Sequence, residues 1–311
     1  MNQFLNIEDV SNLNTTVQDA IALKNNSFLY HSLGKQKTLV LLFFNASLRT
    51  RISTELAAKN LGMNVIVLNL SDAWQLEFED GVVMNLDTSE HIKEAAQVIS
   101  QYASIIGVRA FPILTDKAKD QSEWILKAFS SLASVPVINM ESATAHPLQG
   151  LADAITIAEQ RQYKKPKVVL SWAPHPKALP HAVANSFLQT MQLQDVDLCI
   201  THPEGYDLDP KIVKGTPVFY NQEEALQNAD FVYAKNWSSF NDYGKILSPK
   251  SDWMITKDKI GEAKFMHCLP VRRNVVVEDA VLDSPQSLCI EQSNNRTYAA
   301  QIVLKQILES L

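Results

Sequence analysis

Blocks of apolar residues alternate with amphipathic segments along the first half of the chain. Short apolar runs bounded by turn residues predict buried strands, and longer segments with apolar residues at helical spacing predict helices. The predicted strands are residues 38–44, 65–68, 105–108 and 137–138, and the predicted helices lie near 50–60 and 91–101. This order of elements is typical of a parallel sheet covered by helices on both faces.

The alternation begins again in the second half, after a helical stretch at 153–162 and the basic turn YKKPK. Further strands are predicted at 168–172, 197–201, 230–234 and 264–267, followed by a closing helix at 294–311. The pattern therefore predicts an α/β fold with two doubly wound parallel-sheet domains, joined near residues 140–155. Such sheets bind ligands outside the carboxyl ends of their strands, where we expect the chemistry.

The segment NLDTSEHIKE at residues 85–94 has two interpretations. Asp87, with Glu90 three positions later and an apolar-periodic run after it, predicts a helix start with a reciprocal capping pair. Alternatively, Glu90 faces a substrate and decides which one is accepted.

Composition favours a small-molecule partner. The chain has 311 residues, 46% of them apolar, and 28 Lys and Arg against 34 Asp and Glu give a net charge of −6. This balance offers no basic footprint for nucleic acid. Neither a signal peptide nor a membrane-spanning run of about 20 apolar residues is evident. The three cysteines form no zinc-type pairs, so we expect a soluble cytoplasmic protein.

The spacing of the nine glycines argues against a dinucleotide, the commonest ligand of such folds. No two of them have GxG or GxxxxG spacing, so neither a dinucleotide fingerprint nor a phosphate-binding P-loop is present.

FFNASLRTR, at residues 43–51, follows a predicted strand and opens a predicted helix. Ser47, Thr50 and the first-turn N–H groups would form an anion pocket, with Arg49 and Arg51 adding positive charge. The alternative is a serine cap with two solvated arginines.

HPLQG, at residues 146–150, also lies between a predicted strand and a predicted helix, close to Glu141. Its imidazole and amide could face a polarised carbonyl, or the His-Pro pair could be only a turn. In HCLPVRR, at residues 267–273, Cys268 could be a buried filler. Arg109 and Arg296 could each be a ligand or part of a surface ion pair.

In combination, SLRTR, HPLQ and HCLP resemble the carbamoyl-phosphate motifs of the aspartate and ornithine carbamoyltransferases, from about residue 2 to the C-terminus. The resemblance implies that carbamoyl phosphate binds first, the domains close, and a neutral amine attacks, with no cofactor and no metal. It implies a carbamoyl-phosphate-binding domain at 1–145, an amine-substrate domain at 146–290 and a helix at 291–311 that returns to the first domain. The implied carbamoyl-phosphate contacts are Ser47, Leu48, Arg49, Thr50, Arg109, His146, Gln149, Cys268, Leu269 and Arg296, of which Thr50, Arg109, His146 and Cys268 are the catalytic candidates.

Lys235 indicates which amine is used. Ordinary ornithine carbamoyltransferases read the α-amino group with an acidic residue in a DxWxSMG stretch, whereas this chain has YAKNWSSFNDYG at 233–244. Like charges at ~4 Å repel by roughly 4 kcal/mol at an effective dielectric near 20. Lys235 would therefore reject an ammonium and accept a carboxylate, which favours a substrate whose α-nitrogen is masked as an amide.

Lys235 and the proline-rich stretch SWAPHPKALPHAV at 171–183 resemble the N-acylornithine carbamoyltransferase branch. This resemblance implies a knotted proline-rich loop in the second domain and a homotrimer with shared active sites. Glu141, His175 and Lys235 would contact the N-acylornithine. Trp74 would cover carbamoyl phosphate from the neighbouring subunit.

The acyl group is left open between acetyl and succinyl. The whole chain looks closest to the succinyl type, in which Arg272 could pair with the distal carboxylate, but Glu90 matches the acetyl type. The expected reaction gives N-acylcitrulline and phosphate in arginine biosynthesis. The alternatives are plain ornithine transfer and a non-catalytic protein that binds an anionic metabolite.

Overall fold

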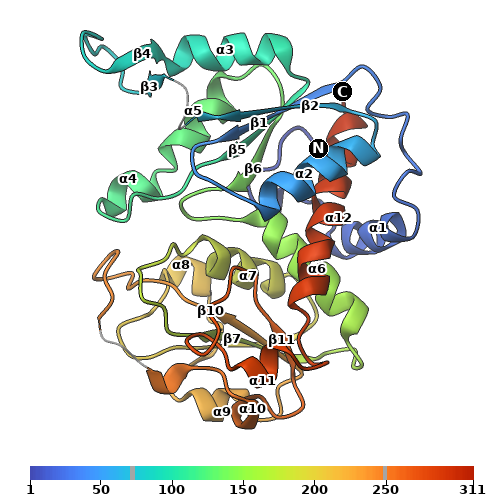
Figure 1. Ribbon diagram of the computed structural model, residues 1–311, viewed down its shortest axis with the longest axis vertical. Coiled ribbons are helices and arrows are strands. Elements are labelled where there is room, and N and C mark those ends of the chain that lie inside the picture. The colour runs from blue at the N-terminus through green and yellow to red at the C-terminus, as the bar shows by residue number, and fades with distance from the viewer. Residues whose placement is uncertain (71–73, 248–250) are drawn as a thin grey trace. The chain divides into compact units, whose positions relative to one another are not determined.

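The computed structural model describes residues 1–70, 74–247 and 251–311 and contains two compact units (Figure 1). Unit 1 consists of Met1–Ile113, Ala118–Leu148 and Arg296–Leu311. Unit 2 consists of Leu114–Lys117 and Gln149–Asn295. Helices α4 (Lys117–Gln121), α6 (Pro147–Gln160) and α12 (Cys289–Leu308) contribute residues to both units. Helices α6 and α12 begin earlier than the sequence pattern indicates.

Unit 1 contains a four-stranded parallel sheet in the order β2-β1-β5-β6. All four strands predicted for this half are confirmed, with small differences at their ends. The strands are β1 (Thr38–Phe43), β2 (Asn64–Asn69), β5 (Ile105–Arg109) and β6 (Val137–Glu141), and the helices are α1 (Leu13–Asn25), α2 (Arg49–Asn60), α3 (Ile92–Tyr102), α4 (Lys117–Gln121) and α5 (Trp124–Leu132).

The alternation of side chains along β1 gives this sheet two apolar faces. Val40 and Leu42 pack in one core cluster with Ile92 of α3 and Phe129 of α5. Leu39 and Leu41 are also fully buried and, because strand side chains alternate, face the opposite side. A strand that is buried on both faces reads as a continuous apolar run, which is why this one was predictable.

The helix start predicted at Asp87 and Glu90 is wrong. Residues Thr88–His91 form a short strand, β4, which pairs in parallel with β3 (Gln75–Glu77), and Leu76 is the partner of Glu90. Helix α3 begins at Ile92, and its cap is His91, whose side chain accepts a hydrogen bond from the Lys93 amide. Strand pairing therefore outweighs the local capping signal.

Unit 2 contains a five-stranded parallel sheet in the order β11-β10-β7-β8-β9. The four strands predicted here are confirmed, and β9 was not predicted. The strands are β7 (Lys167–Trp172), β8 (Asp197–Thr201), β9 (Val218–Phe219), β10 (Phe231–Lys235) and β11 (Lys264–Met266), and the helices are α7 (Ala182–Gln192), α8 (Pro210–Val213), α9 (Gln222–Leu226), α10 (Lys257–Ile260) and α11 (Asp279–Leu282).

The unit 2 sheet is also buried on both faces. Val169 and Val232 pack with Leu226 of α9 and Ile260 of α10. On the other face, the rings of Phe187 in α7 and Tyr233 in β10 lie 4.3 Å apart. The predicted α/β fold with doubly wound parallel sheets is thus confirmed. No helix of residues 1–70, 74–247 or 251–311 is long and apolar enough to cross a membrane.

Strand order defines a ligand-binding position in each sheet. In unit 1 the chain moves outward from β1 in both directions, to β2 on one side and to β5 on the other. In unit 2 it does so from β7, to β8 and to β10. Open α/β sheets bind ligands at such switch points, beyond the carboxyl ends of the strands. The segments that follow β1, β5, β7 and β10 are therefore the places to examine.

Candidate active site

The unit 1 switch point is occupied by Arg109, the last residue of β5. Its Nη1 donates to the backbone carbonyls of Asn45 (2.9 Å) and Ala46 (2.8 Å), in the segment after β1. Its Nη2 lies 3.0 Å from Glu141 Oε2 at the end of β6. Both side chains of this ion pair are about nine-tenths buried, with 7% and 11% exposure. One arginine therefore fixes the ends of three neighbouring strands.

His146, Arg296 and Thr50 extend this cluster within unit 1. His146 Nε2 lies 3.6 Å from Glu141 Oε2 and 3.4 Å from Arg296 Nη2. Arg296 Nη2 also donates to the Thr50 hydroxyl at 2.6 Å. All of these side chains are buried. The structure thus brings together five residues singled out from the sequence: Thr50 and His146 from two motifs, Glu141 near the second motif, and the isolated arginines Arg109 and Arg296.

The start of α2 lies at the edge of this cluster. Helix α2 begins at Arg49, and the side chain of its N-cap residue, Leu48, makes no capping hydrogen bond. The serine cap that the sequence left open as an alternative is therefore not formed, since Leu48 and not Ser47 is the N-cap residue. The N–H groups of a first turn carry positive partial charge and suit an anion such as phosphate. Arg51 instead pairs with Glu55 along the helix, at 3.1 Å.

The unit 2 switch point carries the predicted amine-substrate residues. His175 follows β7, Lys235 ends β10, and Arg272 follows β11. Arg272 Nε donates to His175 Nε2 at 3.1 Å. Partial burial lowers the pKa of His175, and the positive charges of Lys235 and Arg272 add to this effect. His175 is thus neutral at neutral pH, and the site around it is cationic.

The proline-rich loop after β7 lies against the segment after β10. Asn236 Nδ2 donates to the Ala173 carbonyl, and the Ser238 amide donates to the Leu179 carbonyl. His181 Nε2 lies 2.7 Å from the Ser238 carbonyl, and burial lowers its pKa. A neutral His181 therefore joins the two loops on either side of this switch point.

A buried chain of hydrogen bonds within unit 2 joins Gln149 to the HCLP segment. Gln149 and Gln292 both donate to Asp153 Oδ1 at 2.7 Å, and Gln292 Oε1 accepts from the His267 amide. The His267 ring in turn accepts from the Leu269 amide, next to the buried Cys268. Sequence reasoning identified the two ends of this chain but missed Asp153 and Gln292, which belong to no motif.

Trp74 and Glu90 form a pair of their own in unit 1. The indole Nε1 of Trp74 donates to Glu90 Oε2 at 2.8 Å, and the Trp74 side chain is largely exposed. Part of the surrounding SDAWQLEFEDG stretch, residues 71–73, lies outside the described residues.

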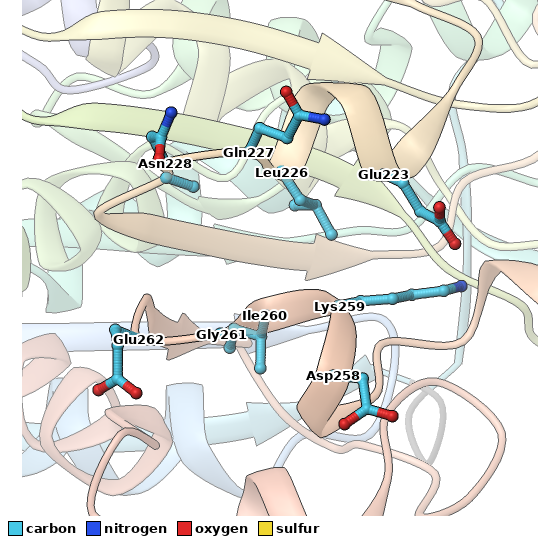
Figure 2. A pocket seen from close by; sticks show the side chains of 10 residues that line it. Glu223, Leu226, Gln227, Asn228, Asp258, Lys259, Ile260, Gly261 and Glu262 are labelled. Carbon is cyan, nitrogen blue, oxygen red and sulfur yellow. The ribbon is translucent and has the colours of Figure 1, made fainter.

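A pocket of about 590 Å³ in unit 2 is lined by α9, α10 and the turns after them (Figure 2). Among its lining residues, Ala229 lies two residues before β10, and Glu262 lies two residues before β11. It thus lies at the amino ends of these strands, opposite the edge at which such sheets bind ligands. We therefore assign it no part in the reaction.

Comparison with known proteins identifies the class. Residues 2–159 match the family model for the aspartate/ornithine carbamoyltransferase carbamoyl-P binding domain, and residues 180–307 match the model for the Asp/Orn binding domain. The chain belongs to the aspartate/ornithine carbamoyltransferase family.

Individual relatives place the chain within that family. It is 47% identical to the N-succinylornithine carbamoyltransferase of Bacteroides fragilis (strain 638R), over 100% of both chains. It is 38% identical to the N-acetylornithine carbamoyltransferase of Xanthomonas axonopodis pv. citri (strain 306), over 98% of this chain and 96% of the relative. The N-acylornithine carbamoyltransferase branch predicted from the sequence is thus confirmed.

A solved structure is similar over nearly the whole chain. It is a variant of N-acetyl-L-ornithine transcarbamylase, with one glutamate replaced by alanine, complexed with carbamyl phosphate and N-succinyl-L-norvaline. The TM-score is 0.90 at 36% identity, covering 99% of this chain and 100% of that one.

Proposed function

We propose that this protein transfers the carbamoyl group of carbamoyl phosphate to the side-chain amine of an N-acylornithine. The products are N-acylcitrulline and phosphate. The observation that carries the proposal is the buried cluster around Arg109 at the unit 1 switch point, beside the first turn of α2. Its cations and N–H groups suit a dianionic phosphate and a carbonyl that gains negative charge during the reaction.

In the proposed reaction, the amine nitrogen attacks the carbamoyl carbon and the bond from that carbon to the phosphate oxygen breaks. Thr50, Arg109 and His146 are the proposed donors to the carbonyl oxygen, and each well-placed donor contributes about 3–4 kcal/mol. The departing phosphate takes the proton that the amine releases. Ser47, Leu48, Arg49 and Arg296 are proposed to hold the phosphate, with Gln149, Cys268 and Leu269 orienting the carbamoyl group.

The roles of the two units follow from this assignment. Unit 1 is proposed to bind carbamoyl phosphate. Unit 2 is proposed to bind the N-acylornithine through His175, Lys235 and Arg272, whose cationic surroundings suit its α-carboxylate. The three cysteines are free thiols, in keeping with a reducing cytoplasm.

The test is formation of the ureido product and release of phosphate from carbamoyl phosphate, with ornithine, N-acetylornithine and N-succinylornithine assayed side by side. We expect product from at least one acylated amine and little from ornithine. No product from any of the amines, together with binding of carbamoyl phosphate, would instead favour a binding protein.

Replacing Lys235 by methionine should raise the KM for the N-acylornithine about tenfold to a hundredfold, because an attraction of up to ~4 kcal/mol at close range is lost and partly screened. The variant should also discriminate less against ornithine, whose ammonium no longer meets a cation. Steady-state kinetics with both amines measures the two effects. Lys211→Met, at an exposed lysine of α8, is the matched control. An unchanged KM would remove Lys235 from the substrate site.

We propose a homotrimer, supported by exposed apolar residues on unit 1. Leu48, just before α2, and Ile52 and Leu56 within α2 recur at helical spacing, with 67%, 57% and 47% exposure. Ile66 and Leu68 are exposed on the adjacent edge strand β2. An apolar surface of this kind on a soluble protein marks an interface, and a second copy of this chain is the proposed occupant. In such a trimer, Trp74 is proposed to cover the carbamoyl phosphate that a neighbouring subunit binds.

Replacing Ile52 by aspartate should convert the trimer into monomers, since a charge would be buried at the interface. Light scattering behind a sizing column measures the mass. Ile290→Asp, at an exposed isoleucine of α12, should leave the mass unchanged. A trimeric Ile52→Asp protein would place the interface elsewhere.

A further inference from the structure

Glu123 has an unusual backbone conformation in unit 1. It is the residue before α5, and its φ of 55° lies in the left-handed region of backbone conformation, which residues other than glycine rarely adopt. Its carboxylate does not cap its own helix. Such strain persists only where the surrounding structure enforces it, and it is found preferentially at functional sites.

The carboxylate of Glu123 instead accepts hydrogen bonds from the loop between β6 and α6. The Ser142 hydroxyl and the Thr144 amide each donate to Oε1 at 2.7 Å, and the Thr144 hydroxyl donates to the same oxygen. The Ala143 amide donates to Oε2 at 3.2 Å. One anionic side chain thus gathers donors from three consecutive residues, and bonds to a charged acceptor are stronger than neutral ones.

This loop connects two members of the Arg109 cluster. Glu141 is the residue before it and His146 is the residue after it. Within the loop, the Ser142 amide donates to the Ala145 carbonyl at 2.7 Å, and the Ser142 hydroxyl accepts from Asn139. The hydrogen bond between Ser142 and Ala145 therefore closes the turn, and Glu123 accepts the remaining hydrogen bonds that residues 142–144 donate. Any shift of the loop would move Glu141 and His146 relative to Arg109.

We propose that Glu123 is a positioning residue for carbamoyl transfer, which holds loop 142–145 so that Glu141 and His146 keep their places beside Arg109. The proposal rests on the proposed function. In that function, Glu123 itself does not contact the substrate. Misplacing a reacting or donor group by ~1 Å can lower turnover about a hundredfold, so loss of the carboxylate should reduce kcat more than it changes KM.

The test is Glu123→Gly, because glycine accepts the left-handed conformation, so the side chain is removed without adding backbone strain. We expect kcat to fall by about tenfold to a hundredfold, with the KM for the N-acylornithine within about threefold of wild type. Gln36→Gly is the matched control, since Gln36 is exposed and also left-handed, with a φ of 63°. Thr144→Val, which removes one donor to Glu123 and leaves the backbone intact, should give a smaller loss and serves if the glycine variant does not fold.

A double-variant cycle separates positioning from a general loss of structure. If Glu123 acts through the loop that carries His146, adding Glu123→Gly to His146→Ala should lower kcat by less than about threefold. Losses that multiply in the double variant, or full kcat in Glu123→Gly, would overturn the proposal. Amide exchange at Ala143 and Thr144 should accelerate in Glu123→Gly and not in Gln36→Gly, and unchanged exchange would equally overturn it. This readout needs no turnover, so it remains informative if wild-type protein fails to carbamoylate any amine.

Discussion

Replacing Arg109 by methionine should lower kcat/KM for carbamoyl transfer about a thousandfold, since a single donor to a developing oxyanion is worth up to this factor. The same change should lower the free energy of unfolding by about 3–5 kcal/mol, because the buried Glu141 carboxylate loses the arginine that lies 3.0 Å from it. The effect is large because the Arg109–Glu141 pair is about nine-tenths buried, whereas an exposed pair contributes little. Steady-state kinetics and urea unfolding measure the two losses separately.

A second variant distinguishes lost chemistry from lost folding. Arg109→Met combined with Glu141→Gln carries no buried charge at this pair, so it should recover most of the stability and none of the activity. Arg161→Met, at an exposed arginine in unit 2, should change neither quantity appreciably. Recovery of activity together with stability in the double variant would show that Arg109 supports the fold and not the reaction.

Elements of this fold could be predicted where neighbouring residues in the sequence determine them. Strands β1, β7 and β10 are buried on both faces, so their apolar runs and the turns that end them stand in the sequence itself. The helix predicted at 91–101 agrees with α3, but the capping pair predicted at Asp87 and Glu90 is wrong, because residues 88–91 pair with β3. Pairing with another segment is tertiary, and no local pattern contains it.

The same distinction applies to the candidate site. Thr50, Arg109 and His146 were identified because each lies at a strand end or a helix start, where motif and topology agree. Glu123 and Asp153 were missed, because each acts through hydrogen bonds to motif residues and belongs to no motif. Such supporting residues can be recognised only in the folded protein, where their hydrogen bonds are formed.

Replacing Glu90 by glutamine should shift the preference from N-acetylornithine toward N-succinylornithine by about tenfold to a hundredfold in the ratio of kcat/KM values. A carboxylate near the distal carboxylate of the succinyl group would repel it by up to ~4 kcal/mol, and the partial exposure of Glu90 reduces this through screening. Glutamine removes the charge but keeps an oxygen that can accept the Trp74 N–H, so the position of the indole should be preserved.

This experiment decides between two opposing indications. Overall identity is higher to an N-succinylornithine enzyme, at 47%, than to an N-acetylornithine enzyme, at 38%. Against this, the carboxylate of Glu90 resembles the acetyl type of the branch, as expected from the sequence. Glu90→Pro should shift the preference in the same direction, although proline also removes a backbone N–H from β4. Glu94→Gln, at an exposed glutamate of α3, is the charge-matched control. If Glu90→Gln and Glu94→Gln leave the acetyl-to-succinyl ratio equally unchanged, selection lies with Arg272 and the rest of the chain. A shift in Glu90→Gln alone would assign the choice of acyl group to this one carboxylate.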